Sequence, residues 1–92
     1  MLSYKAMYKF VDGGVHGEVL DFPGTITFGH SLDEARSLLA SALVDMAETN
    51  FALCEPLPQP NPSASDPEAD IEEPIHLLVS AASHVGVQPQ RG

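Results

Sequence analysis

The sequence predicts a small α+β domain, with an antiparallel sheet, one long helix packed on it and the element order β-β-β-α-β. Three observations lead to this prediction. Apolar and polar residues alternate near the N-terminus, an apolar stripe with helical spacing follows, and a proline-rich acidic segment precedes a last apolar stretch. The 92 residues are enough for one modest core. We expect residues 1–80 to form the domain, including a loop at 55–74, and residues 81–92 to form a C-terminal tail.

The beginning of the chain is typical of a β-hairpin. Side chains alternate over residues 2–11, and the apolar face comprises Leu2, Tyr4, Ala6, Tyr8 and Phe10. Asp12, Gly13 and Gly14 then supply residues that tolerate a positive φ in a tight turn. Residues 15–20 return as a second strand, in which Gly17 indicates a bulge or a close backbone approach.

A turn and a third strand follow the hairpin. Pro23 fixes φ and Gly24 tolerates a positive φ, so the pair suits the corner of a type II turn. Residues 25–28 alternate threonine with an apolar residue, which is the period of a half-buried strand. Gly29 ends this strand before the helix begins.

The start of the helix has a recognisable signature. Ser31 and Glu34 have the spacing of a capping box, in which the serine side chain accepts from a first-turn amide and Glu34 reaches back to the Ser31 amide. The helix is predicted over residues 32–50. We interpret its apolar stripe as the face that covers the sheet, not as a cofactor site; the stripe is Leu32, Ala35, Leu38, Leu39, Ala42, Leu43, Met46 and Ala47.

The segment 55–74 is expected to be an extended or mobile loop, because the prolines at 56, 58, 60, 62 and 67 are interspersed with polar residues and its second half is acidic. The prolines at 58, 60 and 62 also fit a polyproline ligand for a peptide-recognition module, although a plain surface connection is favoured. Residues 75–79 then form a short apolar strand. We expect this strand to add beside the first one and cover its edge; otherwise it is a candidate for pairing with another chain.

Charge is the strongest feature of the composition. The formal net charge is −9, and the four basic residues are Lys5, Lys9, Arg36 and Arg91. Direct binding of DNA or RNA needs a basic patch, so it is not expected here. An acidic surface favours solubility, and it also steers a basic partner by long-range attraction.

The sequence also bears on the cellular compartment. A lone Cys54 cannot form an internal disulfide, which fits a reducing cytoplasm. No apolar run approaches the roughly 20 residues needed to cross a bilayer. Lys5 and Lys9 interrupt the only candidate apolar stretch of a signal peptide. We therefore expect a cytoplasmic protein without membrane contact.

Catalytic and metal-binding motifs are missing from the sequence. The histidines lack the spacing of metal-ligand pairs, and Cys54 has no partner at such a spacing; the histidines are His16, His30, His76 and His84. There is no Gly-rich phosphate loop and no nucleophile elbow. We expect no enzyme activity, metal or cofactor, and we interpret His30 as a polar residue at a corner.

The residues from the turn to the start of the helix form a pattern whose order and spacing are more specific than its parts. Its members are Asp21, Phe22, Pro23, Gly24, Thr27, Gly29, Ser31, Leu32, Asp33, Glu34 and Ala35. This pattern resembles the HicB family of antitoxins. With the preceding Gly-Gly turn and the proline-rich exit, the resemblance covers roughly the first two-thirds of the chain.

The resemblance implies a protein-binding module with a reduced RNase H core. Its partner would be a small, basic, RNA-cleaving toxin similar to HicA, whose RNA-binding and catalytic surface the module covers. It also implies a homodimer or a higher homo-oligomer. Nucleases of the RNase H type hold metal ions with carboxylates. Here the spacing of Asp12, Glu18 and Asp21 does not favour such a site, so an active nuclease is not expected.

The sequence departs from the family's pattern in places, and alternatives stay open. Many relatives carry a C-terminal DNA-binding segment, but the residues after Val79 show neither a helix-turn-helix nor a ribbon-helix-helix pattern. Operator binding by this chain is therefore not expected. Thr25 stands where relatives often have cysteine, and His30 replaces a frequent acid. The alternatives without a toxin are a stand-alone oligomeric scaffold and a degenerate RNase H-like ligand binder with a site between helix and loop.

Overall fold

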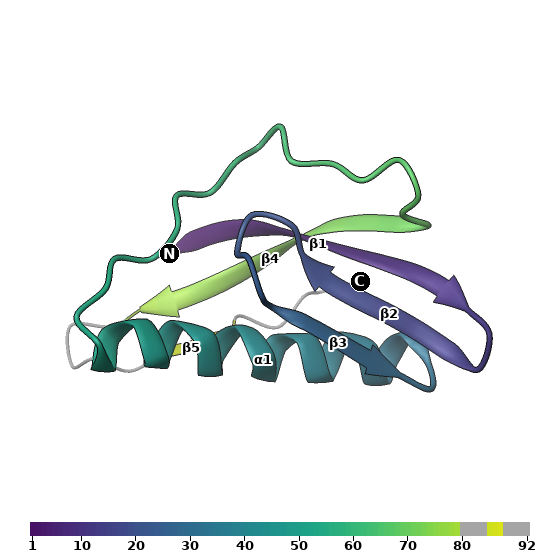
Figure 1. Cartoon of the computed structure of the whole chain (residues 1–92), viewed down its shortest axis with the longest axis horizontal. Helices are drawn as coiled ribbons and strands as arrows, with labels where there is room; N and C mark the ends of the chain where they lie inside the picture. Colours follow the sequence, from purple (N-terminus) through teal and green to yellow (C-terminus); the bar gives the residue numbers. More distant parts are fainter. Residues whose placement is uncertain (80–84, 88–92) are drawn as a thin grey trace.

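The computed structural model describes residues 1–79 and 85–87, which contain one helix and five strands (Figure 1). The elements are β1 Leu2–Val11, β2 Gly14–Val19, β3 Ile26–Gly29, α1 Leu32–Ala52, β4 Ile71–Val79 and β5 Val85–Val87. The predicted α+β class is confirmed, and the helix and the hairpin lie within a few residues of their expected bounds.

The strands pair antiparallel in one sheet, in the order β3-β2-β1-β4-β5. β4 lies beside β1, with Ile75 opposite Tyr4, so the expected pairing of the fourth strand with the first is confirmed. The predicted order β-β-β-α-β is wrong by one strand, because β5 follows and pairs with residues 77–79. β5 falls in the segment 81–92 that we expected to be a tail. Three residues are too few to leave a period in the sequence, and residues 81–84 and 88–92 lie outside the described ones.

β4 is also longer than predicted. It begins at Ile71 and not at residue 75, so the connection between α1 and β4 is 53–70 instead of 55–74. Pro74 lies opposite Lys5, in the part of β4 that β5 does not reach.

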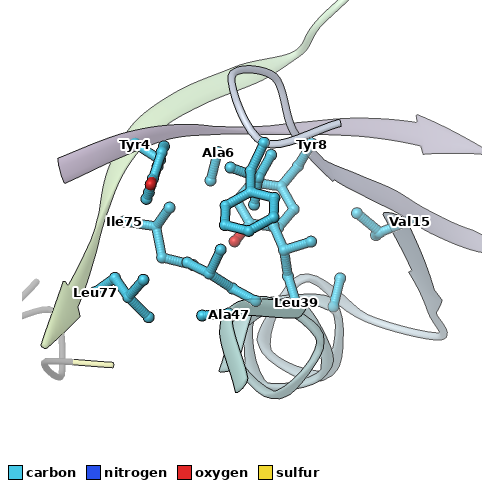
Figure 2. Packing of buried hydrophobic residues seen from close by; sticks show 12 residues of the cluster. Tyr4, Ala6, Tyr8, Val15, Leu39, Ala47, Ile75 and Leu77 are labelled. Atoms are coloured by element: carbon cyan, nitrogen blue, oxygen red, sulfur yellow. The ribbon is translucent and has the colours of Figure 1, made fainter. Parts of the chain in front are cut away.

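The helix covers one face of the sheet, called here the inner face, and the core lies between them (Figures 1 and 2). Tyr4, Ala6 and Tyr8 of β1 are buried there as expected, whereas Phe10 near the end of the strand is exposed. The core cluster comprises Tyr4, Ala6, Tyr8, Val15, Val19, Phe22, Ala35, Leu39, Leu43, Ala47, Ile75 and Leu77.

The helix buries a narrower stripe than the sequence predicts. Its buried residues lie four apart and are Ala35, Leu39, Leu43 and Ala47. Leu38, which the predicted stripe included, is exposed. A stripe spaced by four residues rotates slowly around the helix, so Leu38 lies on its flank and not against the sheet.

The third strand alternates as predicted, but its threonines face the inner side and its apolar side chains the outer side. β3 begins at Ile26, and Ile26 and Phe28 are 53% and 49% exposed. The register sets this orientation, because Ile26 and Phe28 lie opposite Glu18 and His16 of the outer face of β2. Thr25 is fully buried, and its Oγ1 has no hydrogen-bond partner among the described residues.

Candidate functional site

The pattern residues follow the chain from the turn after β2, along β3 and into the start of α1, so they lie at both ends of β3 (Figure 1). The Thr25 amide donates to the Phe22 carbonyl at 3.2 Å, and Gly24 has φ +90°, so the predicted type II turn is confirmed. Pro23 and Gly24 form its exposed tip. Phe22 turns inward and meets the Tyr4 ring edge-on, with ring centroids 5.4 Å apart. The turn is therefore fixed to the core by its first residue.

Close backbone contact joins the end of β3 to the helix. A Cβ at Gly29 would lie 2.6 Å from the Ala35 amide nitrogen, so only glycine fits there. Ala35 is fully buried at the same contact, and Leu32 packs against the edge of the core. Gly29, Leu32 and Ala35 thus have packing roles, which accounts for their place in the pattern.

The helix begins with half of the expected capping box. Ser31 is the N-cap, and its Oγ accepts from the Glu34 amide at 3.1 Å. The Glu34 side chain was expected to accept from the Ser31 amide, but Oε1 accepts from the His30 amide at 3.0 Å instead. This backbone hydrogen bond, followed by the contact of the His30 ring with the same oxygen, lowers the pKa of Glu34. His30 is consequently a corner residue attached to the cap.

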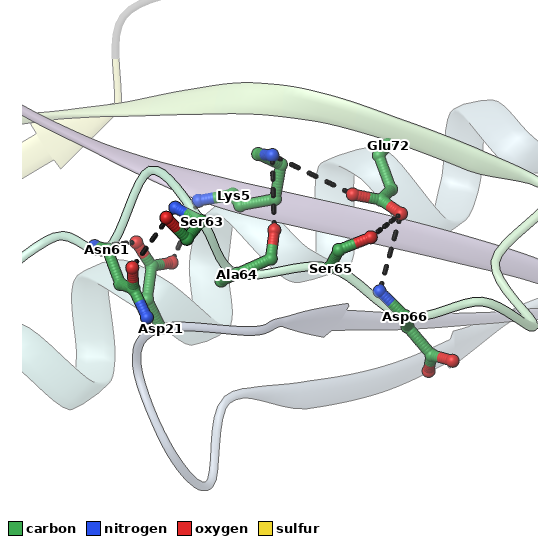
Figure 3. A network of polar contacts seen from close by, with 8 residues as sticks. All are labelled: Lys5, Asp21, Asn61, Ser63, Ala64, Ser65, Asp66 and Glu72. Atoms are coloured by element: carbon green, nitrogen blue, oxygen red, sulfur yellow. Dashed lines mark hydrogen bonds and ion pairs between the residues drawn. The ribbon is translucent and has the colours of Figure 1, made fainter.

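Asp21 joins three segments that lie far apart in the sequence (Figure 3). Its Oδ1 accepts from the Lys5 amide and its Oδ2 accepts from the Asn61 amide, both at 2.8 Å. One carboxylate therefore connects β1, the turn after β2 and the loop 53–70. The sequence pattern identified Asp21 but gave no signal for Asn61. Asn61 binds through its backbone amide, 40 positions away, and any residue except proline offers such a donor.

Further contacts hold the loop 53–70 on the outer face of β1 and β4 (Figures 1 and 3). Lys5 Nζ donates to the Ala64 carbonyl at 3.2 Å and lies 3.7 Å from the Glu72 carboxylate. The same carboxylate accepts from the Ser65 hydroxyl at 3.0 Å. The expected loop is thus extended, and polar contacts tie it to both strands.

The proline-rich half of the loop also contacts the domain. The Tyr4 hydroxyl donates to the Pro58 carbonyl at 2.8 Å, and Leu57 packs against the core. With the Asn61 amide bound to Asp21, these contacts hold residues 57–61 against their own chain. This arrangement favours a surface connection over a polyproline ligand.

A second cluster of charges fastens the helix to β4. Arg36 donates to both carboxylate oxygens of Glu73, at 2.8 and 3.1 Å, which raises the Arg36 pKa. The guanidinium carbon also lies 5.9 Å from the centre of the Tyr8 ring. Burial, and then the Glu73 charge, raise the pKa of Tyr8 to about 12, against a smaller opposite effect of Arg36. The arrangement is that of a structural clamp.

The outer face of β2 and β3 carries a different kind of surface, called here the open face and defined by His16, Glu18, Ile26 and Phe28. A Cβ at Gly14 would lie 2.5 Å from a ring carbon of Phe28, so this ring lies over the Gly14 backbone. It also meets the His30 ring edge-on at 6.2 Å. The exposed aromatic side chain of Phe28 is thereby held in place on β3, an edge strand of the sheet.

The described residues bring together no metal-binding set. They contain no group of three His, Cys, Asp or Glu side chains able to hold a metal ion. The carboxylate of Asp21 is occupied by two amides, and His76 contacts the Ser3 hydroxyl at 2.7 Å. His84 lies outside the described residues. A shallow hollow lies between α1 and β5 and is lined by Ala40, Ser41, Val44, Asp45 and Val87.

The chain matches no protein-family model, and a search of curated proteins finds no significant match. Within residues 1–79 and 85–87, α1 is too polar to serve as a membrane-spanning helix.

Proposed function

We propose that this chain is an antitoxin-type, protein-binding module similar to HicB. It would neutralise a small, basic, RNA-cleaving toxin similar to HicA by covering the toxin's RNA-binding and catalytic surface. The proposal rests on the pattern from Asp21 to Ala35 and on the distribution of charge. A HicB-like reduced RNase H core belongs to the same proposal, which the helix on an antiparallel sheet supports.

The observation that carries the proposal is that every lysine and arginine in the described residues already has a carboxylate partner. Lys5 pairs with Glu72, Lys9 with Glu68, and Arg36 with Glu73 and Asp33. No basic side chain in this part of the chain is left to bind phosphate. Several exposed carboxylates have no partner among the described residues, namely those of Asp12, Asp45, Glu48 and Glu55.

Unpaired negative charge suits a basic partner for two physical reasons. Long-range attraction raises the rate of encounter, and complementary charges favour the correct orientation of the complex. A toxin surface that binds RNA is positive because it must neutralise phosphates. The acidic module would occupy that surface in place of RNA, and inhibition would need no chemistry from the module itself. This function places both proteins in the cytoplasm.

Self-association is part of the proposal, as a homodimer or a higher homo-oligomer. The alternative function is a stand-alone oligomeric scaffold without a toxin, which the exposed apolar residues of β3 favour. The two functions differ in whether a second gene product is needed. A scaffold would assemble alone and would change nothing in a cell that expresses a neighbouring basic protein.

The test is co-expression with the product of an adjacent reading frame that encodes a short basic protein. We expect this chain to relieve growth arrest caused by that product and to copurify with it, and we expect added salt to weaken the complex. A triple variant, Asp45→Asn with Glu48→Gln and Glu55→Gln, should slow association. The matched control, Ser37→Asn with Ser41→Asn, should not. Growth arrest that persists despite expression of the folded chain would exclude the antitoxin role.

A further inference from the structure

We infer that β3 is the interface between two copies of this chain, paired antiparallel through their β3 strands about a two-fold axis at Thr27. The inference rests on the self-association proposed above and does not depend on a toxin. β3 ends the sheet, since the order is β3-β2-β1-β4-β5. Within residues 1–79 and 85–87, the edge of β3 that points away from β2 is therefore unpaired.

The backbone of β3 presents hydrogen-bonding groups at this edge. The Val19 amide donates to the Thr25 carbonyl at 2.9 Å, and the register pairs Gly17 with Thr27. Bonded and non-bonded pairs alternate in an antiparallel ladder. Thr25, Thr27 and Gly29 thus bond to β2, while the N–H and C=O groups of Ile26 and Phe28 point away from the sheet.

The same two residues make the edge self-complementary. When two β3 strands pair antiparallel about Thr27, Ile26 of each copy lies opposite Phe28 of the other. Each such pair exchanges both backbone hydrogen bonds, because these are the residues whose groups point outward. A β-branched residue and an aromatic residue also form a favourable cross-strand pair. The contact is isologous and closed, so it yields a dimer and not a fibre.

Nothing in β3 protects the edge from such pairing. Natural edge strands commonly carry charges or proline, and Ile26–Gly29 has neither. Leu38 is exposed on the helix flank opposite to Arg36, so apolar surface continues on the helix side of the sheet. The Phe28 ring, held over Gly14, loses little freedom when a second strand covers it.

Charge favours a second copy over a basic protein as the occupant. Residues 22–32 carry no aspartate, glutamate, lysine or arginine, so a basic partner finds no carboxylate on this strand. Two copies with a net charge of −9 each meet here without opposing charged side chains on β3. Their remaining long-range repulsion is screened by salt. Added salt should therefore strengthen this dimer, whereas it should weaken a complex with a basic toxin.

Sedimentation equilibrium of the full chain alone tests the interface. We expect twice the chain mass of 9.8 kDa, and about tenfold or more weaker association in an Ile26→Lys, Phe28→Lys double variant that keeps its circular dichroism. The matched control is Leu53→Lys, a residue 62% exposed beyond the helix end, which should leave the dimer unchanged. A monomeric wild-type chain, an unchanged double variant or an equally weakened control would overturn the inference.

Cysteine cross-linking tests the register and remains informative if the lysine variant does not fold. In a Cys54→Ser background, Thr27→Cys places the two thiols opposite each other at a non-bonded antiparallel pair, where Cβ atoms come close enough for a disulfide. Ile26→Cys places them diagonally and out of reach. Rapid dimer cross-linking of the first variant and little of the second is expected. Equal cross-linking of both would contradict the register.

Discussion

The two halves of the outer face of the sheet are covered in different ways. Over β1 and β4 the loop 53–70 lies across the strands, and Met7 is 2% exposed although it faces away from the helix. Over β2 and β3 nothing in the described chain covers the apolar side chains, and Ile26 is 53% exposed. One half of this face is completed by the chain itself, and the other is available to a partner.

The covered half shows how a polar loop can cover the outer face of a sheet. Its contacts are mostly between side chains and backbone groups, such as Asp21 with the Lys5 and Asn61 amides. Each contact satisfies a donor that would otherwise lose water on burial. The open face lacks such contacts, so a substitution there should affect assembly more than folding.

The largest loss of free energy of unfolding is expected for Met7→Ala, and Ile26→Ala is the variant to compare with it. Removing a buried methionine side chain leaves a cavity and should lower the free energy of unfolding by about 2–5 kcal/mol. Ile26→Ala should lower the free energy of unfolding of the monomer by about 1 kcal/mol or less, because half of the side chain is already in water. Urea denaturation at low protein concentration measures both. Equal losses of free energy of unfolding would contradict the view that only one half of the outer face is covered.

Alkaline pH probes the inner face of β1, on which both tyrosines are buried. The pKa of Tyr8 is raised to about 12, so between pH 10 and 12 the unfolded chain loses this proton while the folded chain keeps it. The stabilisation is complete below pH 10 and is lost as pH rises towards 12, by about 2–3 kcal/mol. Ultraviolet absorbance of the phenolate follows the titration. Tyr8→Phe should remove this loss and leave the smaller one from Tyr4, whose pKa burial also raises.

Asp21→Ala should lower the free energy of unfolding by about 2 kcal/mol, because it leaves the Lys5 and Asn61 amides without their acceptor. Limited proteolysis should then cut the loop 53–70 faster. The control Asp45→Ala removes an exposed carboxylate of the helix that has no partner in the described structure, and it should change neither quantity. Unchanged proteolysis of the Asp21 variant would show that the loop is held by other contacts.

The smallest effect concerns the ion pairs. Glu73→Gln should lower the free energy of unfolding by about 1 kcal/mol. The bidentate contact with Arg36 is partly buried, but solvent still weakens it. Glu68→Gln breaks the exposed pair with Lys9 and should cost a few tenths of a kcal/mol. Thermal unfolding at low and high salt compares them. A larger loss for Glu68→Gln would contradict the account of the clamp.

Local patterns predicted the local structure well. The Gly-Gly hairpin, the turn at Pro23 and Gly24, and the helix after Ser31 all depend on residues within a few positions of one another, and the structure has each of them. The pairing of β4 with β1 also followed from an apolar segment that needs a neighbour.

Features that depend on the three-dimensional arrangement escaped prediction. Alternation shows that a strand has two faces, but not which face another element covers, so the sequence did not show that Ile26 and Phe28 lie on the outer side. β5 is too short to leave a period. The bond between Asp21 and the Asn61 amide joins positions that no local rule connects. The resemblance to HicB and the antitoxin role stay predictions.

The most direct test of the contrast between the two halves is amide hydrogen exchange of the full chain as a function of its own concentration. We predict that exchange at Ile26 and Phe28 slows as the concentration rises, while exchange at Met7 is slow and constant. Exchange at Ile26 and Phe28 that is equally fast at every concentration would contradict the account.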